Sequence, residues 1–187
     1  MQKTTTVGAR DRLLEVAGRL FYAHGIHAVG VDRVIAEAGV AKATLYAHFS
    51  GKEELVAAYL RQRSAEWQVW VDSSLPALAN DPADRVLGLF DLLAERLSAP
   101  GYRGCPFINA AAEYPGPGLV SEQISGHRVR VRQLFRQLVD EVGRPDSSAL
   151  TETLMVLYDG AMVSAQLDAN PSAAHHAQLA AQRLLRP

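Results

Sequence analysis

A pair of short helices separated by a glycine constrains this chain more than any other stretch of its sequence. From Val31 onward, apolar side chains recur at positions i, i+3, i+4 and i+7, which places them on one face of a helix. Gly39 is expected to end this helix, because glycine adopts the left-handed conformation without steric cost. A second helix of barely two turns is predicted over residues 41–48. Two helices joined in this way form a helix-turn-helix, which places its second helix in the major groove of DNA.

The second of these helices carries an outer face that suits a DNA groove. Leu45 and Phe49 lie four residues apart and are predicted to anchor the helix to the core. On the opposite face, alanines let the backbone approach closely, hydroxyl groups form hydrogen bonds, and basic side chains meet phosphates. The residues that we predict to contact DNA from this face are Lys42, Ala43, Thr44, Tyr46 and His48.

Several short segments carry a resemblance that is more specific than the helix pair alone. They are LFYAHG at residues 20–25, AGV at 38–40, TLY at 44–46, HF at 48–49 and KEEL at 52–55. Together they resemble the TetR/AcrR family of transcriptional repressors over roughly the first 60 residues. The resemblance implies that Lys52, with the N-terminus of its helix, binds the phosphate beside the recognition helix.

The start of the first helix of the pair departs from the pattern of that family. Many relatives have a hydroxyl residue where this chain has Gly30, and a basic or hydroxyl residue where it has Asp32. Asp32 favours the positive end of the helix dipole, but a carboxylate does not hold a phosphate. We therefore regard the neighbouring Arg33 as the candidate DNA contact from this helix.

Helical patterns continue through the rest of the sequence, without an alternating strand pattern or an internal repeat. Further helices are predicted over residues 9–24, 51–73, 82–98, 106–113, 119–142, 147–168 and 172–185. Ser50 and Glu53 are expected to form a capping box, and Asp81 is expected to cap the helix that Pro82 opens. The expected protein is all-α with about nine helices. It combines an N-terminal three-helix helix-turn-helix domain, residues 1–52, with a larger helical domain for effector binding and dimerisation, residues 53–187.

The formal net charge of −1 conceals an uneven distribution along the chain. Residues 1–63 hold nine lysines and arginines against six acidic residues, whereas the remainder holds ten against fourteen. A basic N-terminal part fits a DNA-binding end on a body that does not bind DNA. The basic run from Arg128 to Arg136 is interpreted as the solvated face of a helix. Residues 1–7 are interpreted as a solvated tail, and the alternative is that Lys3, with Arg10 and Arg12, reaches a backbone phosphate or a minor groove of DNA.

Signals of export, membrane insertion and catalysis are missing from the sequence. The N-terminus has no apolar signal region, no apolar run reaches 18 residues, and the single Cys105 cannot form an internal disulfide. These features predict a cytoplasmic protein. A glycine-rich phosphate loop, a nucleophile elbow and a clustered acid–base pair are all missing, and His175 and His176 are adjacent rather than four residues apart. We therefore expect no enzymatic activity, no catalytic residue, no metal site and no cofactor.

The loop RGCPFINAA, from Arg103 to Ala111, resembles the LmrA/YxaF-like subset of the same family. That resemblance implies a small-molecule pocket among the middle helices. Aromatic side chains with a few polar groups suit an apolar or aromatic effector, although each alone is more typical of a core. The candidates are Trp67, Trp70, Phe90, Tyr102, Cys105, Phe107, Asn109, Glu113, Tyr158, Met162 and Gln166. Cys105 is interpreted as a small buried hydrophobe, with a thiol sensor as the alternative.

Small and apolar residues on the last two helices predict a homodimer, because they let helices from two chains approach closely in a four-helix bundle. The candidate interface residues are Leu154, Leu157, Ala161, Ser164, Ala165, Ala177, Ala180 and Leu184. The alternative is that these stripes face the core of their own chain. Dimerisation is favoured on functional grounds, since a two-turn recognition helix binds DNA weakly and two half-sites multiply the contact.

Our hypothesis from the sequence is a homodimeric repressor that an apolar or aromatic small molecule releases from a palindromic DNA operator. Two alternatives stay open. One is an activator or architectural DNA-binding protein that has the same N-terminal helix-turn-helix domain, which we call the head, but no effector. The other is a helical ligand-binding or enzymatic protein whose head no longer binds DNA, which Gly30 and Asp32 leave open.

Overall fold

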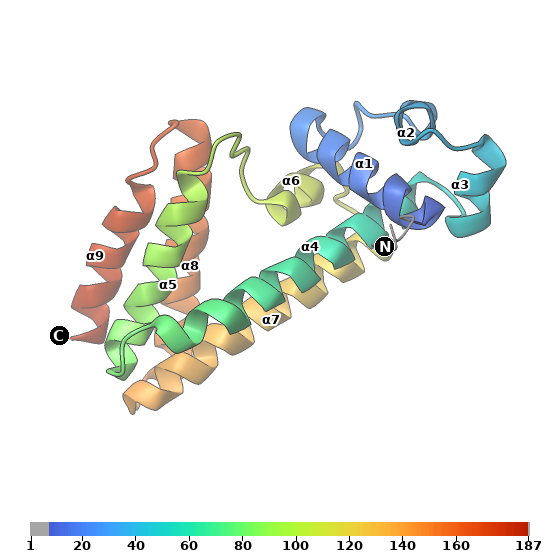
Figure 1. Cartoon of the computed structure of the whole chain (residues 1–187). Helices are drawn as coiled ribbons and strands as arrows, with labels where there is room; N and C mark the ends of the chain where they lie inside the picture. Colours follow the sequence, from blue (N-terminus) through green and yellow to red (C-terminus); the bar gives the residue numbers. More distant parts are fainter. Residues whose placement is uncertain (1–7, 187) are drawn as a thin grey trace, which may run out of the picture. The chain divides into compact units, whose positions relative to one another are not determined.

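The computed structural model describes residues 8–186, and within that range every regular element is a helix (Figure 1). The elements are α1 (Ala9–His24), α2 (Val31–Ala38), α3 (Lys42–His48), α4 (Lys52–Ser74), a 3-10 turn η1 (Leu75–Ala77), α5 (Pro82–Leu97), α6 (Pro106–Glu113), α7 (Leu119–Val142), α8 (Ser147–Leu167) and α9 (Ala173–Leu185). This confirms the predicted all-α class. Among these helices, none is both long and apolar enough to cross a membrane. Lys3, for which a DNA contact was the alternative interpretation, lies outside the described residues.

Local sequence signals account for most of the helix ends. Gly39 ends α2 with φ 62° and ψ 41°, in the left-handed region that glycine adopts without strain. Asp81 caps α5, where its carboxylate accepts a hydrogen bond from Asp84 N at 3.0 Å and Pro82 occupies the first helical position. The backbone hydrogen bond from Asp84 is the largest influence that holds the pKa of Asp81 below its usual value. Both ends agree with the prediction.

The capping box predicted for α4 paired Ser50 with Glu53, and the structure shows that the acidic partner was predicted wrongly. The backbone N of Ser50 donates to Glu54 Oε2 at 2.6 Å, not to Glu53. Because α4 begins at Lys52, Glu54 rather than Glu53 is its third residue, the position from which a side chain reaches back to the preceding turn. Glu53 instead accepts a hydrogen bond from the backbone N of Leu119, the first residue of α7, at 3.0 Å.

The chain divides into two compact units. The first unit contains the described part of Met1–Ala65 together with Pro106–Ile124, and the second contains Glu66–Cys105 together with the described part of Ser125–Pro187. Helices α4 and α7 therefore contribute residues to both units, and α6 belongs to the first. The domain boundary placed between residues 52 and 53 stays a prediction.

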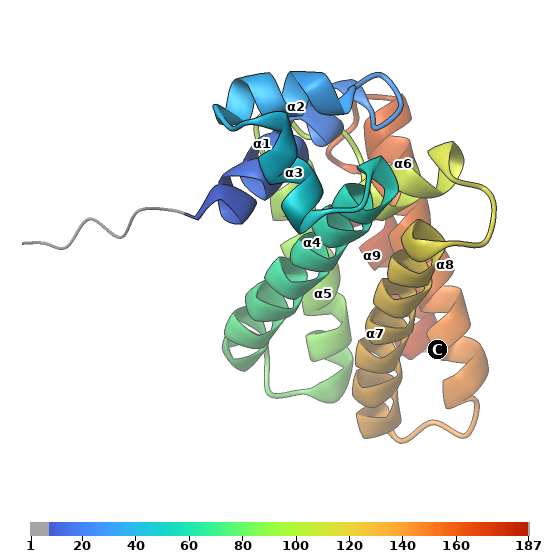
Figure 2. The same ribbon diagram turned by 90° about the vertical axis from the view of Figure 1, so that its right-hand side faces the viewer.

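The first unit is built on the contacts of α1 with α2 and α3 (Figure 2). The anchors predicted for α3 are confirmed, since Leu45 and Phe49 are fully buried. The rings of Phe21 and Tyr59 meet edge to face with 5.8 Å between their centroids. Gly18 allows this packing, because a Cβ atom there would lie only 3.2 Å from the Tyr59 ring. A rigid, close-packed scaffold thus supports the two short helices.

In the second unit, α9 packs against both α5 and α8 (Figure 1). Its core holds three rings, those of Phe90, Phe135 and Tyr158, whose centroids lie 5.4 to 6.3 Å apart in edge-to-face arrangements. Such pairs contribute about 0.5–1.5 kcal/mol each beyond the area that they bury. Burial raises the pKa of Tyr158 to about 12, so its hydroxyl stays protonated at neutral pH.

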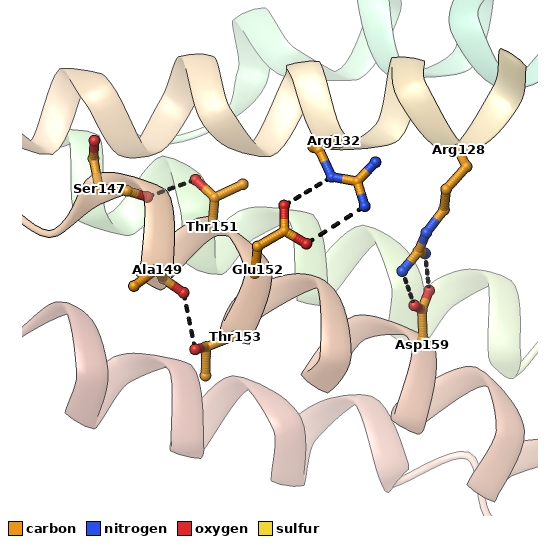
Figure 3. A network of polar contacts seen from close by, with 8 residues as sticks. All are labelled: Arg128, Arg132, Ser147, Ala149, Thr151, Glu152, Thr153 and Asp159. Atoms are coloured by element: carbon orange, nitrogen blue, oxygen red, sulfur yellow. Dashed lines mark hydrogen bonds and ion pairs between the residues drawn. The ribbon is translucent and has the colours of Figure 1, made fainter. Parts of the chain in front are cut away.

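Three arginines of α7 pair with acidic side chains, as expected for a helix face that does not bind DNA. Arg132 Nε donates to Glu152 at 2.8 Å, and Arg128 forms an ion pair with Asp159, both across to α8 (Figure 3). Arg136 pairs within α7, with Asp140 at 3.1 Å. Arg132 and Arg136 are exposed enough that each pair contributes little to stability.

A buried histidine makes the stability of the second unit dependent on pH. His127 is 8% exposed, and its ring meets Trp67 edge to face at 5.1 Å. Burial, and then the charges of Arg130, Arg96 and Arg128, lower its pKa from 6.5 to about 4. Between these two values the unfolded chain binds the proton more readily than the folded chain does. The stability that neutral His127 contributes is therefore complete above about pH 6.5 and is lost as the pH falls towards 4.

We expect the thermal midpoint of the protein to fall across this pH range, and the fall to be smaller in His127→Phe, which keeps a ring against Trp67 but cannot bind a proton. Circular dichroism melts at a series of pH values measure the effect. His176→Phe is the matched control. Because His176 is exposed on α9, its replacement should leave the fall of the thermal midpoint with pH unchanged. An equal pH dependence in His127→Phe and in the unaltered protein would contradict the prediction.

Candidate nucleic-acid interface

The outward face of α3 is bare in the first unit. Tyr46 is 48% exposed, and Lys42, Ala43, Ala47 and His48 are exposed as well, while Thr44 is half-buried. The opposite side of the helix is held by Leu45 and Phe49. A helix of seven residues that is anchored on one side only presents its small, hydroxyl and basic side chains to whatever occupies the other side. That surface has the dimensions and the chemistry of a recognition helix.

Lys42 is held at the start of this face by the neighbouring helix. Its Nζ donates to Asp32 Oδ1 at 3.1 Å, and both side chains are well exposed. This hydrogen bond is the main reason that the pKa of Lys42 is raised above its usual value. Asp32 thus places a negative charge beside the face predicted to meet phosphates.

Arg33 lies in an exposed network along α1 and α2. Its Nε donates to Glu37 Oε1 at 3.0 Å, and Arg19 donates to the other oxygen of the same carboxylate at 2.8 Å. The two arginines, Arg19 first, hold the pKa of Glu37 below its usual value. The guanidinium of Arg33 also lies 3.3 Å from His24 Nε2. Its side chain remains about half exposed, so the charge is accessible at the surface of α2.

Lys52 lies beside the loop that joins α1 and α2. Its Nζ donates to the carbonyl oxygen of His27 at 3.3 Å. Partial burial lowers the pKa of Lys52, and the nearby charge of Glu113 opposes that shift. Glu113 was predicted as an effector-pocket residue, but in the structure its carboxylate accepts hydrogen bonds from the backbone of Ile26 and His27. It belongs to the first unit, and its contact with this loop was not predicted.

The other predicted effector residues fall into both units. Phe107 and Asn109 belong to the first unit with Glu113, and the remaining eight belong to the second. In the second unit, Trp67, Phe90 and Tyr158 are buried within the core, while Gln166 is exposed. The members in between are partly buried: Trp70, Tyr102, Cys105 and Met162. The hydroxyl of Tyr102 donates to the carbonyl oxygen of Met162 at 3.2 Å.

None of these residues lines either of two surface hollows of the second unit. One is on α7, lined by Gln133, Arg136, Gln137, Asp140 and Glu141. The other lies beside α5, η1 and α9, lined by Ala77, Leu78, Ala79, Asp84, Leu87, Gly88, Asp91, Gln178 and Gln182. The predicted effector residues therefore remain a prediction.

Half of the predicted dimer residues face the core of their own unit. Leu154, Ala161, Ala165 and Ala177 are buried in a single chain, which is the arrangement that the alternative interpretation described. Leu157, Ser164 and Ala180 are half-buried, and Leu184 is 37% exposed.

The sequence prediction did not include Val156, Val163 and Leu167, the large members of a different apolar stripe of α8. This stripe consists of Val156, Gly160, Val163 and Leu167, at spacings of four, three and four residues, and its three large side chains are 68, 37 and 77% exposed. We call these four residues the α8 stripe. On α9, Leu179 is exposed as well. The helical spacing of the stripe was its signal in the sequence, but the prediction chose the face of α8 that carries Leu154, Ala161 and Ala165, which is buried in the single chain.

Comparison with known proteins places these features in a family. A sequence profile described as "Bacterial regulatory proteins, tetR family" matches residues 13–59, which include α2 and α3. Over nearly its whole length the chain is similar to SCO4454, a TetR-family transcriptional regulator from Streptomyces coelicolor. The two are 37% identical, the alignment covers 96% of each chain, and the TM-score is 0.87.

Curated relatives match over only part of the chain. The transcriptional activator FasR of Mycolicibacterium smegmatis is 45% identical over 53 residues, which is 28% of this chain and 24% of FasR. The transcriptional regulator YxaF of Bacillus subtilis is 42% identical over 53 residues, 28% of each chain. The transcriptional repressor KstR2 of M. smegmatis is 32% identical over 81 residues, 43% of this chain and 39% of KstR2. Each match thus spans less than half of the relative.

Proposed function

This chain belongs to the TetR family of DNA-binding transcriptional regulators, and from that premise we propose that it is a homodimeric repressor released from a palindromic operator by a small molecule. The observation that carries the proposal is the bare outer face of α3, with Tyr46 48% exposed above the fully buried Leu45. A face of this composition has no packing role in the described part of the first unit. A DNA major groove accepts an α-helix of this kind.

The side chains of the head divide into two roles. Lys42, Thr44 and Tyr46 contact bases or phosphates in the groove, and Ala43 lets the helix backbone approach the base edges. His48 and Lys52 hold the DNA backbone on one side of the recognition helix. Arg33 contacts a phosphate from α2. To do so it gives up its exposed ion pair with Glu37, which costs little free energy.

Dimerisation is proposed through α8 and α9. The α8 stripe leaves Val156 and Leu167 more than two-thirds exposed, an arrangement that monomers rarely tolerate as a contiguous apolar patch. Gly160 within the stripe has open space beyond its Cα, so a helix from a second chain could approach closely there. Two chains joined in this way present two recognition helices, which raises affinity for a palindrome by about 10²- to 10⁴-fold over one.

Release by an effector is proposed for the second unit. Its rings, including those of Trp67, Phe90 and Tyr158, suit an apolar or aromatic molecule with a few polar groups. Helix α4 contributes residues to both units and is the covalent route by which a change in one unit reaches the other. DNA and effector then weaken each other's binding by the same factor, as linkage requires.

The test begins with DNA. The unaltered protein is used to select duplexes from a random pool, and the selected duplex is then titrated in a mobility-shift assay between about 50 and 200 mM salt. We expect a palindrome whose half-sites are about one helical turn apart or a multiple of it, and a steep loss of affinity with salt. Recovery of no palindrome, or binding that salt leaves unchanged, would overturn the proposal.

A second candidate role is activation, because the relative FasR is named an activator while KstR2 is named a repressor. A reporter gene placed behind the selected palindrome separates the two roles. Lower expression in the presence of the protein supports repression, and higher expression supports activation.

Asp32 provides a prediction about the charge of the head. Asp32→Asn removes a negative charge beside the groove-facing surface and frees Lys42 from its ion pair, so affinity for the selected duplex should rise by about two- to fivefold. Fluorescence anisotropy measures the change. Asp72→Asn, which alters an exposed aspartate of α4 in the second unit, should leave affinity unchanged. If Asp32→Asn instead weakens binding, Asp32 serves to orient Lys42 towards DNA.

A further inference from the structure

Glu113, the last residue of α6, binds the backbone of a loop that is remote in sequence. Its Oε1 accepts a hydrogen bond from Ile26 N at 2.8 Å, and its Oε2 accepts one from His27 N at 2.5 Å. The loop begins at Gly25, whose φ of 89° turns the chain out of α1. Irregular backbone of this kind needs acceptors from outside itself. A carboxylate is well suited here, because both of its oxygens accept and two adjacent N–H groups converge on it.

The same loop also binds Lys52. The Nζ of Lys52 donates to the carbonyl oxygen of His27 at 3.3 Å, so the two peptide groups of His27 are bound by one carboxylate and one ammonium group. The ring of Tyr114, next to Glu113, meets the ring of His27 edge to face at 5.1 Å. The charge of Glu113 also favours the charged form of Lys52 against the effect of partial burial. Glu113, the loop and Lys52 therefore form one connected cluster within the first unit.

A second carboxylate, that of Glu53, binds the far end of the segment that joins α6 to α7. Glu53, next to Lys52 in the first turn of α4, accepts from the backbone N of Leu119 at 3.0 Å. Burial, followed by the charges of Glu53 and Glu113, raises the pKa of Tyr114, which lies between these two anchoring points in sequence. The segment from Glu113 to Leu119 is thus fixed to the head at both ends, which gives Glu113 a defined position from which to hold the loop.

We propose that Glu113 is a positioning residue for DNA binding: by fixing the loop at Ile26 and His27, it holds in place the carbonyl that orients Lys52 towards a phosphate. The inference rests on the proposed phosphate contact of Lys52. Without the carboxylate, the peptide group that contains the N–H of His27 loses its fixed orientation. The next peptide group, whose carbonyl oxygen binds Lys52, is then less well fixed, and Lys52 loses the backbone partner that directs its Nζ. Glutamine cannot replace the carboxylate, because its amide offers one acceptor oxygen and turns an N–H₂ group towards the second backbone N–H.

The experiment compares Glu113→Gln, Lys52→Ala and the double variant on the duplex selected by the unaltered protein. Anisotropy titrations give the dissociation constant of each protein at several salt concentrations. Glu113→Gln should bind about tenfold more weakly at low salt. Its salt slope should fall by about one, as expected when one lysine–phosphate contact is lost. The double variant should bind no more weakly than Lys52→Ala, since both changes remove the same contact.

Glu122→Gln is the matched control, because Glu122 is exposed in the first turn of α7 and its replacement makes the same change in charge. It should bind as the unaltered protein does, and melting curves verify that all four variants fold. Losses that add in the double variant would overturn the inference, because they indicate a structural role independent of Lys52. So would weak binding in Lys52→Ala beside normal binding in Glu113→Gln, which leaves the proposed function standing. If the unaltered protein selects no duplex, the proposed function fails and this inference fails with it.

Discussion

Replacing Val163 with aspartate should convert the protein into a monomer and weaken its binding to the selected palindrome by at least about 100-fold. Val163 lies at the middle of the α8 stripe, between Gly160 and Leu167. A carboxylate in the centre of an apolar interface would have to lose its water without gaining a partner, which costs several kcal/mol. Each half-site would then be bound by a separate chain, and the gain from holding two recognition helices together would be lost.

Light scattering after size exclusion gives the mass of the variant, and anisotropy gives its affinity for DNA. Val69→Asp is the matched control, because Val69 is 69% exposed on α4 and lies outside the α8 stripe. It introduces the same charge on the same type of residue and should leave both mass and affinity unchanged. A dimeric Val163→Asp protein would show that the interface lies elsewhere on the surface.

Leu45→Ala should remove DNA binding by a different route, through the stability of the recognition helix. Leu45 is fully buried, and with Phe49 it anchors the seven residues of α3. Truncation leaves a cavity under a helix that has few other contacts, at a cost of about 3 kcal/mol. If the closed state of α3 is only marginally favoured, this loss leaves α3 open in most molecules, and affinity for the duplex drops by up to about 100-fold. Hydrogen exchange of the α3 amides measures the opening of the helix, and anisotropy measures the affinity for the duplex.

The control for this change is Leu119→Ala. Leu119 also lies in the first unit, but it is 44% exposed, and only its backbone takes part in the bond to Glu53. Its truncation should alter the free energy of unfolding by no more than about 0.5 kcal/mol. Fast exchange of α3 in both variants would mean that the whole head is marginally stable, and that Leu45 has no special part in holding the helix.

The outward face of α3 could be predicted because its determinants are local. The four-residue spacing of Leu45 and Phe49 defines the inner side of the helix, and the residues between them must then face out. The cap at Asp81 and the stop at Gly39 are equally local, since each depends on one side chain and its nearest turn. Errors of one residue at a helix start were enough to exchange Glu53 for Glu54 in the capping interaction.

Two features could not be predicted, for separate physical reasons. Glu113 lies 87 residues from Ile26, and no periodicity in a sequence reveals a hydrogen bond between a helix end and a remote loop. In α8, apolar residues occupy both the side that packs in the second unit and the α8 stripe. When a helix is apolar on two sides, its pattern predicts burial but does not assign either side to a core or to a partner.

The continuity of α4 and α7 restricts how this protein can change in length. Helix α4 runs unbroken for 23 residues, about 34 Å, and the division between the units falls within it, after Ala65. One inserted residue would advance the rest of the helix by about 1.5 Å and turn it by about 100°. Helix α7 also contributes residues to both units, with the division after Ile124. Insertions and deletions among homologous proteins should therefore lie in the connections around residues 98–105 and 143–146. The number of residues in α4 and α7 should stay constant.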